Sequence, residues 1–481
     1  MVSFILPGNS ASGGFDVDNS LRFNDGSSDN LSRSTASGTD TVWTWSGWLK
    51  RSHLGTSQTF FGTGNGSSSA NSLQIRFDDS DRLDYRDFVS DAYNGRLQTN
   101  AKFRDVSSWY NFIFVWDTTQ GTAGNRMKVY INGVQETSFA DERDATQNSS
   151  AHTSGSTTFL GTDGYGGNTF FDGYLAEVVF IDGTALDPTS FGEFDEDTGI
   201  WKPINVSGLT FGTNGFYLNV PGPSTGQNSN GLGGDSSGND NHFASSGLSA
   251  VDQSTDTCTN NYSTINSLDN YYQASTFSEG NLKAVTSSGN ETYNISTIGV
   301  ASGKWYWEVK IVNSSTNGTY GITDSVSRGT SNFLGDDAYD TAYLKDGKVY
   351  RDSGYVSGFS SGGTLATYDT GDILMFALDL TNNGLYAGKN GTWGNSGNPT
   401  SGASKTGAIP IDAVTSTSTG FYFPAFGEWT GGASATYSVN FGSPEFAISS
   451  GNSDGNGYGN FEYAVPSGYY ALNTKNLAEY G

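Results

Sequence analysis

Hydrophobic and polar residues alternate in short runs along most of residues 20–190, and Gly, Asn, Asp and Ser separate these runs. Residues 42–49, 107–116, 126–134 and 173–181 each form such a run, and the third leads into Asn132-Gly133, a strong hairpin signal. Alternation of this kind is typical of a strand with one face in a core and the other in water. The pattern predicts a β-sandwich in which Trp43 and Trp45 pack in the core.

A second set of strand-like runs occupies residues 303–311, 371–379 and 438–442. Between the two sets, residues 221–241 are almost entirely Gly, Ser, Asn, Asp and Pro, so they cannot bury a core of their own. The predicted organisation is a first domain at 1–200, a connector with short strands at 201–275, a second sandwich at 276–447 and an extension at 448–481. Only residues 185–194 predict a short helical turn.

The motifs of the first region resemble the laminin-G-like, concanavalin A-like jelly-roll family. They are Leu21-Arg-Phe23, Trp43-Thr-Trp-Ser-Gly-Trp48, the strand at Trp109, Tyr130-Ile-Asn-Gly133 and Phe171-Asp-Gly-Tyr-Leu-Ala-Glu-Val178. Residues 276–447 resemble the SPRY domain family through Gly303-Lys-Trp-Tyr-Trp-Glu-Val309, Gly371-Asp-Ile-Leu374 and Val439-Asn-Phe-Gly442. These resemblances imply an all-β chain of two concanavalin A-like antiparallel β-sandwiches joined by a Gly/Ser/Asn-rich connector. Fold alone does not identify a ligand.

The charge balance restricts the partners. The formal net charge is −25, from 24 Lys and Arg against 49 Asp and Glu, which argues against nucleic acid and anionic membranes as ligands. Cys258 is the only cysteine, so no intrachain disulfide can form, and the three histidines show no metal-ligand spacing. The first residues lack a basic region, and no apolar run reaches the length of a membrane helix, so we expect neither a secretory signal nor membrane insertion.

Several acidic clusters have the oxygen ligands that calcium prefers. The candidate metal ligands are Asp78, Asp79, Asp81 and Asp235. Asp84 belongs to the same cluster as the first three, and Asp336, Asp337 and Asp340 form a second cluster. The alternative for the loop clusters is solvated charge that keeps the protein soluble. The alternative for Asp235 is a turn whose backbone is satisfied by its own side chains.

The sequence gives no catalytic set, so no enzyme activity is expected. Only Glu193-Phe-Asp-Glu-Asp197 approaches the paired carboxylates of a glucanase, and it follows the helical turn as surface acid. Aromatic residues in Gly-rich loops are instead the candidates for glycan contact, because loops lie at the surface and ring faces suit sugars. They are Tyr165, Trp393, Trp429 and Tyr458.

The whole chain resembles a family of marine bacteriophage virion proteins. The resemblance rests on Asn19-Ser-Leu-Arg-Phe23, Thr259-Asn-Asn-Tyr262, Ser278-Glu-Gly-Asn-Leu282 and Pro466-Ser-Gly-Tyr-Tyr-Ala-Leu472. It implies a tail-fibre or spike-like appendage, assembled in the host cytoplasm, that contacts other virion proteins and binds host surface polysaccharide. A capsid decoration or head fibre with a purely architectural role, and a polysaccharide depolymerase, are the alternatives. A homotrimer is expected, with Phe4-Ile-Leu6 and Tyr469-Tyr-Ala-Leu472 as candidate contacts, since several copies raise avidity.

Overall fold

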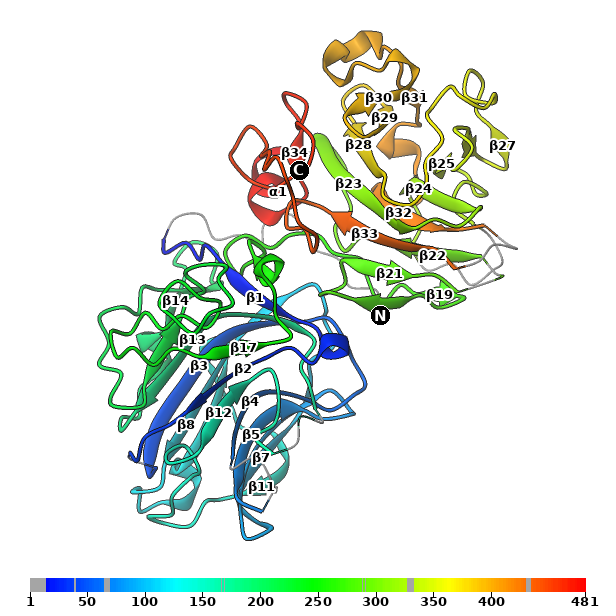
Figure 1. The fold of residues 1–481 in the computed structure, drawn as a ribbon. Coiled ribbons are helices and arrows are strands. Elements are labelled where there is room, and N and C mark those ends of the chain that lie inside the picture. Colours follow the sequence, from blue (N-terminus) through cyan, green and yellow to red (C-terminus); the bar gives the residue numbers. More distant parts are fainter. Residues whose placement is uncertain are drawn as a thin grey trace. The chain divides into compact units, whose positions relative to one another are not determined.

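The computed structural model describes residues 14–38, 40–64, 70–165, 167, 169–287, 289, 291–326, 333–429 and 434–481. The described chain is almost entirely strands and loops (Figure 1). It divides into two compact units, residues 11–259 and residues 260–481. Each unit contains two facing β-sheets, whose strands pair antiparallel apart from one short parallel pairing in the second unit.

The two sheets of the first unit are named after their central strands, β3 and β5. In the order of neighbouring strands, the β3 sheet comprises β10 (Val134–Glu136), β9 (Met127–Ile131), β8 (Trp109–Asp117), β3 (Val42–Arg51), β13 (Gly173–Asp182), β1 (Ser20–Phe23) and β18 (Gln253–Ser254), with β16 (Phe216–Leu218) also paired to β13. The β5 sheet comprises β11 (Phe139–Arg143), β7 (Ala92–Lys102), β6 (Arg82–Val89), β5 (Ser72–Phe77), β4 (Gln58–Gly64), β12 (Thr157–Leu160), β2 (Asn30–Ser34) and β17 (Ala244–Ser246). A separate hairpin joins β14 (Gly192–Phe194) to β15 (Trp201–Pro203).

Large aromatic side chains fill the space between these two sheets. Trp43 and Trp45 are fully buried, as their alternation in the sequence predicts. Trp43 meets Tyr85 of the β5 sheet with ring centroids 5.9 Å apart, and Trp45 meets Phe60 at 5.7 Å. Each such side chain buries roughly 150–250 Å² of surface, so these contacts supply much of the hydrophobic stabilisation of the unit.

The hairpin predicted at Asn132-Gly133 is confirmed. Strands β9 and β10 flank these two residues, whose φ angles are 48° and 78°. Two successive positive φ angles match the right-handed twist of the flanking strands, and Asn followed by Gly adopts them with little strain.

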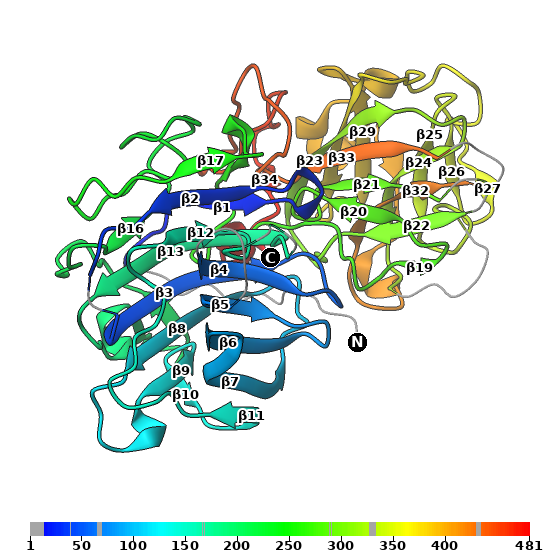
Figure 2. The ribbon, with the colours of Figure 1, turned by 60° about the horizontal axis from the view of Figure 1, so that its bottom comes forward.

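The sheets of the second unit are named after β24 and β23. The β24 sheet comprises β19 (Tyr271–Tyr272), β22 (Thr292–Ile295), β32 (Phe423–Glu428), β24 (Gly318–Thr323), β25 (Thr341–Leu344), β26 (Val349–Arg351) and β27 (Gly354–Tyr355). The β23 sheet comprises β20 (Thr276–Ser278), β21 (Lys283–Val285), β33 (Thr436–Asn440), β23 (Lys304–Asn313), β28 (Ile373–Asp379), β29 (Gly384–Lys389) and β30 (Thr392–Trp393), with β31 (Ile409–Pro410) paired to β29 and β34 (Tyr470–Ala471) paired to β23. Strands of both sandwiches are labelled in Figure 2.

Trp305 and Trp307, at alternate positions of β23, are fully buried in this second sandwich. Tyr320 of the β24 sheet packs edge-on against Tyr437 of the β23 sheet, with ring centroids 5.5 Å apart. The second unit therefore has a core independent of that of the first, which is why the chain forms two units.

The predicted connector at 201–275 is wrong. Residues 201–259 belong to the first unit, and β16, β17 and β18 each extend one of its sheets. Phe216 and Phe243 are buried in its core, with ring centroids 4.9 Å apart. Backbone pairing to existing strands and a few apolar side chains thus order a segment whose composition is nearly all polar. The division falls between Thr259 and Asn260, not near residues 200 and 276.

The C-terminal residues are also part of a sandwich. Tyr469, Ala471 and Leu472 are fully buried in the second unit, so they are not available as the oligomer contact that the sequence predicts. Phe4-Ile-Leu6 lies outside the described residues. Glu308 of β23, itself fully buried, accepts hydrogen bonds from the backbone nitrogens of Glu462 and Tyr463 at 3.0 and 2.8 Å.

Helical structure is confined to short pieces in the described chain. The one α-helix, α1 (Thr474–Tyr480), begins where the side chain of Asn473 accepts a hydrogen bond from Asn476 N, a cap that the sequence analysis missed. The predicted helical turn at 185–194 contains a 3-10 helix. The 3-10 helices are Asp25–Ser27, Ala123–Asn125, Pro188–Ser190, Ala250–Asp252, Gly394–Ser396, Pro399–Ser404 and Val414–Ser416.

A bulge interrupts β13 between Ala176 and Val179, where its pairing with β3 shifts. Glu177 lies in this bulge with a φ of 50°, and its side chain is buried. Its carboxyl accepts a 2.5 Å hydrogen bond from the Tyr217 hydroxyl. Burial raises the pKa of Glu177 to about 7, and the Tyr217 hydrogen bond only partly offsets this rise.

Candidate functional site

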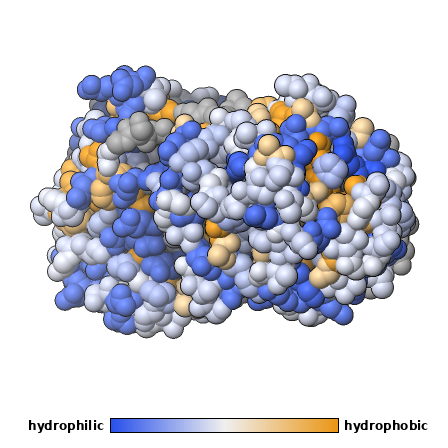
Figure 3. Space-filling view, turned by 90° about the horizontal axis from the view of Figure 1, so that it is seen from above, coloured by the Kyte–Doolittle hydropathy of each residue, from blue (hydrophilic) through white to orange (hydrophobic). Residues whose placement is uncertain are grey.

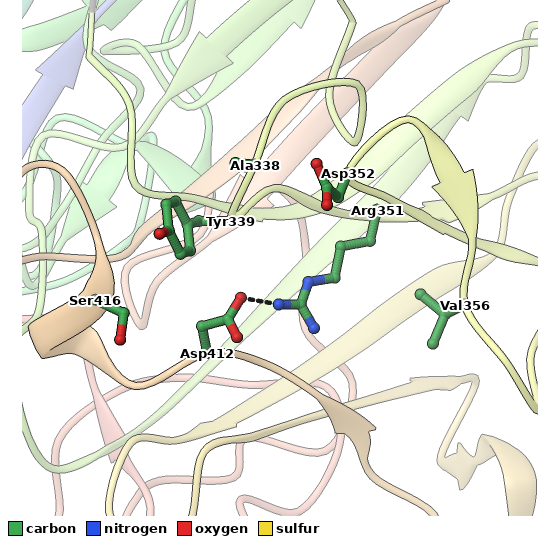
Figure 4. A pocket seen from close by; sticks show the side chains of 7 residues that line it. All are labelled: Ala338, Tyr339, Arg351, Asp352, Val356, Asp412 and Ser416. Carbon is green, nitrogen blue, oxygen red and sulfur yellow. Dashed lines mark hydrogen bonds and ion pairs between the residues drawn. The ribbon is translucent and has the colours of Figure 1, made fainter.

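The second unit contains a cavity of about 550 Å³ at the edge of the β24 sheet. Three separate segments supply its described lining. These residues are Ala338, Tyr339, Arg351, Asp352, Val356, Asp412 and Ser416 (Figure 4). Cavities of roughly 300–1,000 Å³ are the usual size for small-ligand sites, so this one has room for a small ligand.

An ion pair between Arg351 and Asp412 crosses the cavity (Figure 4). Arg351 ends β26, and its Nη1 also donates to the carbonyl of Pro410 at 2.9 Å. The backbone of Asp412 is also fixed, because the hydroxyl of the buried Tyr422 donates a hydrogen bond to the Asp412 carbonyl at 3.2 Å. These bonds fix the positions of both charges before any ligand arrives.

The turn after Arg351 places a second carboxylate at the cavity. Asp352 and Ser353 join β26 to β27 with φ angles of 49° and 57°, and neither is glycine. The Ser353 hydroxyl donates to the carbonyl of Asp336 at 2.6 Å, which ties this hairpin to the loop that carries Tyr339.

Tyr339 is held in a conformation that large side chains rarely adopt. Its φ is 67°, in the left-handed region, where residues with a Cβ atom are disfavoured. The neighbouring loop is fixed from within, because the buried Asp340 carboxylate accepts a hydrogen bond from Gly335 N at 3.1 Å. Strain of this kind persists where surrounding structure enforces it, and it is enriched at ligand sites.

The polar groups of the lining are only partly used by the protein. Among the described residues, the Tyr339 hydroxyl, the Asp352 carboxylate and the Ser416 hydroxyl make no hydrogen bond to protein, whereas Arg351 and Asp412 are paired. The cavity thus combines an aromatic ring with unused donors and acceptors. This combination suits a ligand that carries several hydroxyl groups.

These residues could not be predicted from the sequence, because they come from three segments far apart in the chain. The nearest residues that the sequence singled out are Asp336 and Asp337, as candidate calcium ligands, just before Ala338 and Tyr339 of the lining. Nothing in the sequence marks Tyr339, since its φ follows from the folded loop.

The four aromatic residues predicted to contact glycan are divided between the two units. Tyr165 lies in the first unit, and the other three lie in the second unit outside the described cavity lining. Trp429 stacks on Phe333 with centroids 4.6 Å apart, and Trp393 packs against Tyr306 at 6.4 Å. Tyr458 lies in a loop whose backbone is held by the Asp454 carboxylate at 2.9 Å.

The predicted metal ligands of the first unit already accept hydrogen bonds. Asp78 accepts from Ser80 N and Gln98 Nε2, at 2.9 and 2.8 Å. Asp81 forms ion pairs with Arg51 at 3.1 Å and Arg104 at 3.0 Å. Asp79 is exposed between them. These contacts favour turn formation and ion pairing for this cluster.

Asp235 also has its oxygens occupied. It accepts from Tyr217 N and Ser237 N at 2.9 Å each, and from Asn241 N at 2.8 Å. This arrangement matches the interpretation of a turn satisfied by its own side chains.

A different group in the first unit could hold a cation. One ligand atom each from Asp25, His53 and Asp172 lies within 4.8 Å of the others. The hydrogen bond from His53 lowers the pKa of Asp25 and raises the pKa of His53. A metal ion would have to displace the proton from this histidine, so its binding would strengthen as pH rises.

The acidic segment at 193–197 forms an ordered surface turn. Lys202 contacts Glu193 at 3.4 Å and Asp195 at 3.1 Å, and Asp195 also accepts hydrogen bonds from Thr198. The segment lies on the separate β14–β15 hairpin, not on a strand of either large sheet. It does not present two carboxylates on one face of such a strand, as a glucanase pair would require.

Comparison with known proteins supports the fold. Residues 25–189 match the sequence model of the Concanavalin A-like lectin/glucanases superfamily. No curated protein matches the chain in sequence. With its antiparallel sandwiches, the chain has the predicted all-β, concanavalin A-like fold class.

Several solved structures are similar to parts of the chain. The SPRY domain of human HERC1 is 17% identical, with 33% of this chain and 87% of that chain covered and a TM-score of 0.24. The SAP-like pentraxin from Limulus polyphemus is 16% identical, with 36% and 80% covered and a TM-score of 0.27. Domain 4 of AbnA, a GH43 extracellular arabinanase from Geobacillus stearothermophilus, was solved in complex with arabinotriose. It is 17% identical, with 33% and 69% covered and a TM-score of 0.24.

Proposed function

We propose that this protein is a bacteriophage virion appendage that adheres to glycans of the host surface through the cavity lined by Tyr339, Asp352 and Asp412. The observation that carries the glycan part is the cavity itself, where a strained aromatic ring adjoins polar groups that the protein leaves unused. The lectin/glucanase similarity of residues 25–189 supports carbohydrate binding in general. The virion part rests on the resemblance of the whole sequence.

The proposed role is binding without cleavage. In the cavity, Asp412 is held in an ion pair with Arg351, which suits orientation of sugar hydroxyls and leaves this carboxylate poorly placed to accept a proton. Release of reducing ends from host polysaccharide would contradict this part of the proposal and favour the depolymerase alternative.

Binding by weak single sites gains from several copies, so we propose a homotrimer. The surface drawn in Figure 3 is mostly hydrophilic, and its apolar residues gather only in small groups. Large exposed apolar side chains are also scattered among the described residues, at Val89, Val134, Phe194, Val285 and Tyr355. The contact between copies is therefore expected to be largely polar, and light scattering should show a mass above 51.0 kDa.

The test is glycan-array binding by the purified full chain and by the variant Tyr339→Gly. Glycine adopts a φ of 67° without strain, so the variant should fold normally while losing the ring. We expect its Kd for the best array glycan to rise about tenfold, which corresponds to about 1.4 kcal/mol.

Phe194→Ala is the matched control, because it removes an aromatic side chain that is 50% exposed in the other unit. It should bind as the unchanged protein does. An unchanged Kd for Tyr339→Gly would remove the cavity from the proposal, and binding to no glycan at all would favour the architectural alternative.

A further inference from the structure

Four arginines gather on the outer side of the β5 sheet. Strand register places Arg143 beside Arg96, Arg96 beside Arg86, and Arg86 beside Gln74. Arg76 of β5 projects from the same side of the sheet, two residues after Gln74, and pairs with Asp84 of β6. We call these four side chains the arginine face. The alternate residues of β5, Leu73, Ile75 and Phe77, are fully buried, so the arginines project away from the core.

Two carboxylates lie among the four guanidinium groups. Asp84 is fully buried and contacts Arg76 at 3.2 Å, Arg86 at 3.5 Å and Arg96 at 2.7 Å. Asp141 contacts Arg96 at 2.8 Å and Arg143 at 3.1 Å. The arginine face therefore carries two more positive charges than negative ones, in a chain whose net charge is −25.

Some donors on this face have no protein acceptor. Arg76 and Arg143 each use only Nε in hydrogen bonds, so their terminal nitrogens make no such bond within the described residues. The pKa of Arg86 is lowered mainly by burial and, to a smaller extent, by the positive charge of Arg76. The positive charges thus repel one another, and an incoming anion would relieve that repulsion.

Aromatic rings hold the guanidinium groups in place. Arg86 lies over Phe88 at 5.2 Å, and both Arg96 and Arg143 lie over Tyr93, at 5.1 and 4.7 Å from the ring centroid. Stacking of this kind fixes planar groups before a ligand binds, so less conformational entropy is lost on binding.

The loop that carries Tyr165 borders this face. It crosses β4 so closely that a Cβ atom on Gly62 would lie 2.8 Å from the carbonyl of Thr162. Tyr165 is close enough to Arg86 to influence its pKa. The one predicted contact residue of the first unit therefore lies beside the arginines.

We propose that the arginine face binds the anionic group, carboxylate or sulfate, of an acidic polysaccharide. Guanidinium groups form paired, charge-assisted hydrogen bonds with such groups and gain little from neutral sugars. The proposal rests on the proposed function only in taking the ligand to be a glycan. It places a second site, selective for acidic sugars, in the other unit.

The experiment is calorimetric titration of the full chain with trigalacturonate, a carboxylate trisaccharide, and with maltotriose, its neutral counterpart. A sulfated galactan trisaccharide serves as the second anionic probe. We expect either or both anionic probes to bind at least tenfold more tightly than maltotriose. Binding should weaken about tenfold between roughly 50 and 300 mM salt, since exposed charges are screened.

Two variants locate the site. Arg143→Gln changes a side chain that is 53% exposed, so the fold should persist, and Arg76→Gln removes a guanidinium whose terminal nitrogens are unused. Each should weaken anionic binding about tenfold. Lys128→Gln removes one positive charge from the β3 sheet of the same unit and is the control.

Unchanged binding of the anionic trisaccharides by both arginine variants would overturn the proposal. So would an affinity for maltotriose equal to that for the anionic trisaccharides, or tighter binding of a single-stranded oligonucleotide than of these trisaccharides. Tyr339→Gly separates this proposal from the cavity. Loss of acidic-sugar binding in Tyr339→Gly, with retention in Arg143→Gln, would assign that binding to the second unit and refute the arginine face.

Discussion

Glu177 provides the sharpest test of how burial controls the stability of the first unit. Its pKa rises from 4.5 to about 7 on folding, because the bulge of β13 removes the carboxyl from water. A difference of that size is equivalent to about 3 kcal/mol, since each pH unit of pKa difference is about 1.36 kcal/mol. Replacing this carboxyl by a neutral amide of the same shape, as in Glu177→Gln, should remove the effect.

The direction of the pH dependence follows from proton binding. Between pH 4.5 and about 7 the unfolded chain releases a proton that the folded state retains, so stability falls as pH rises. The stability that the folded state gains by keeping Glu177 protonated is fully present below pH 4.5 and is lost above pH 7. Glu177→Gln should match the unchanged protein near pH 4.5 and exceed it by up to about 3 kcal/mol at pH 8.5.

Differential scanning calorimetry from pH 4.5 to 8.5 measures this difference. For a unit of this size, about 3 kcal/mol corresponds to a rise in Tm of roughly 6–12 °C. Glu196→Gln makes the same substitution at an exposed position and should leave the pH profile unchanged. Parallel pH profiles for Glu177→Gln and the unchanged protein would refute the reasoning.

Three further changes test the packing. Trp43→Ala, in the first core, should cost about 3–5 kcal/mol in denaturant unfolding, and a loss below 1 kcal/mol would contradict its full burial. Glu308→Ala should cost about 3 kcal/mol, because the backbone nitrogens of Glu462 and Tyr463 lose their acceptor, and it should expose the segment before β34 to limited proteolysis. Protection equal to that of the unchanged protein would show that Glu308 does not hold this segment in place. Gly62→Ala should cost about 1–3 kcal/mol, because its Cβ would meet the carbonyl of Thr162 at 2.8 Å, whereas Gly121→Ala, with open space around it, should be neutral.

The strands with strong alternation could be predicted from sequence because the physics there is local. Trp43, Trp45, Trp305 and Trp307 occupy alternate positions, and alternate positions of a strand share a face whatever the rest of the fold. The turn at Asn132-Gly133 is equally local, since two residues set its geometry.

The organisation of the polar segments could not be predicted, because it depends on partners far along the chain. Ala244 of β17 pairs with Ser32, and Gln253 of β18 pairs with Leu21, more than 200 positions away. Such edge strands contain few apolar residues, so composition favours a connector. Their order comes from hydrogen bonds to strands that already exist.

The candidate site was missed for the same reason. Tyr339, Arg351 and Asp412 come from three segments far apart in the chain, which meet only when the second unit has folded, and none stands in a motif. The acidic candidates Asp78 and Asp81 were conspicuous in sequence, yet their oxygens bind the protein's own donors. Clustering of one residue type along the chain does not reveal whether its charges are already neutralised.

The start and end of the second unit are joined by their own hydrogen bonds. Asn261 N donates to the Thr474 hydroxyl at 3.0 Å, and Ser263 N donates to the carbonyl of Leu472 at 2.9 Å. During translation, residues 260–263 leave the ribosome some 200 residues before their partners. The first unit can therefore fold while it is still attached to the ribosome, whereas the second stays open until nearly all of it has been made. Chaperones that act on this protein would meet the second unit as the long-lived unfolded species.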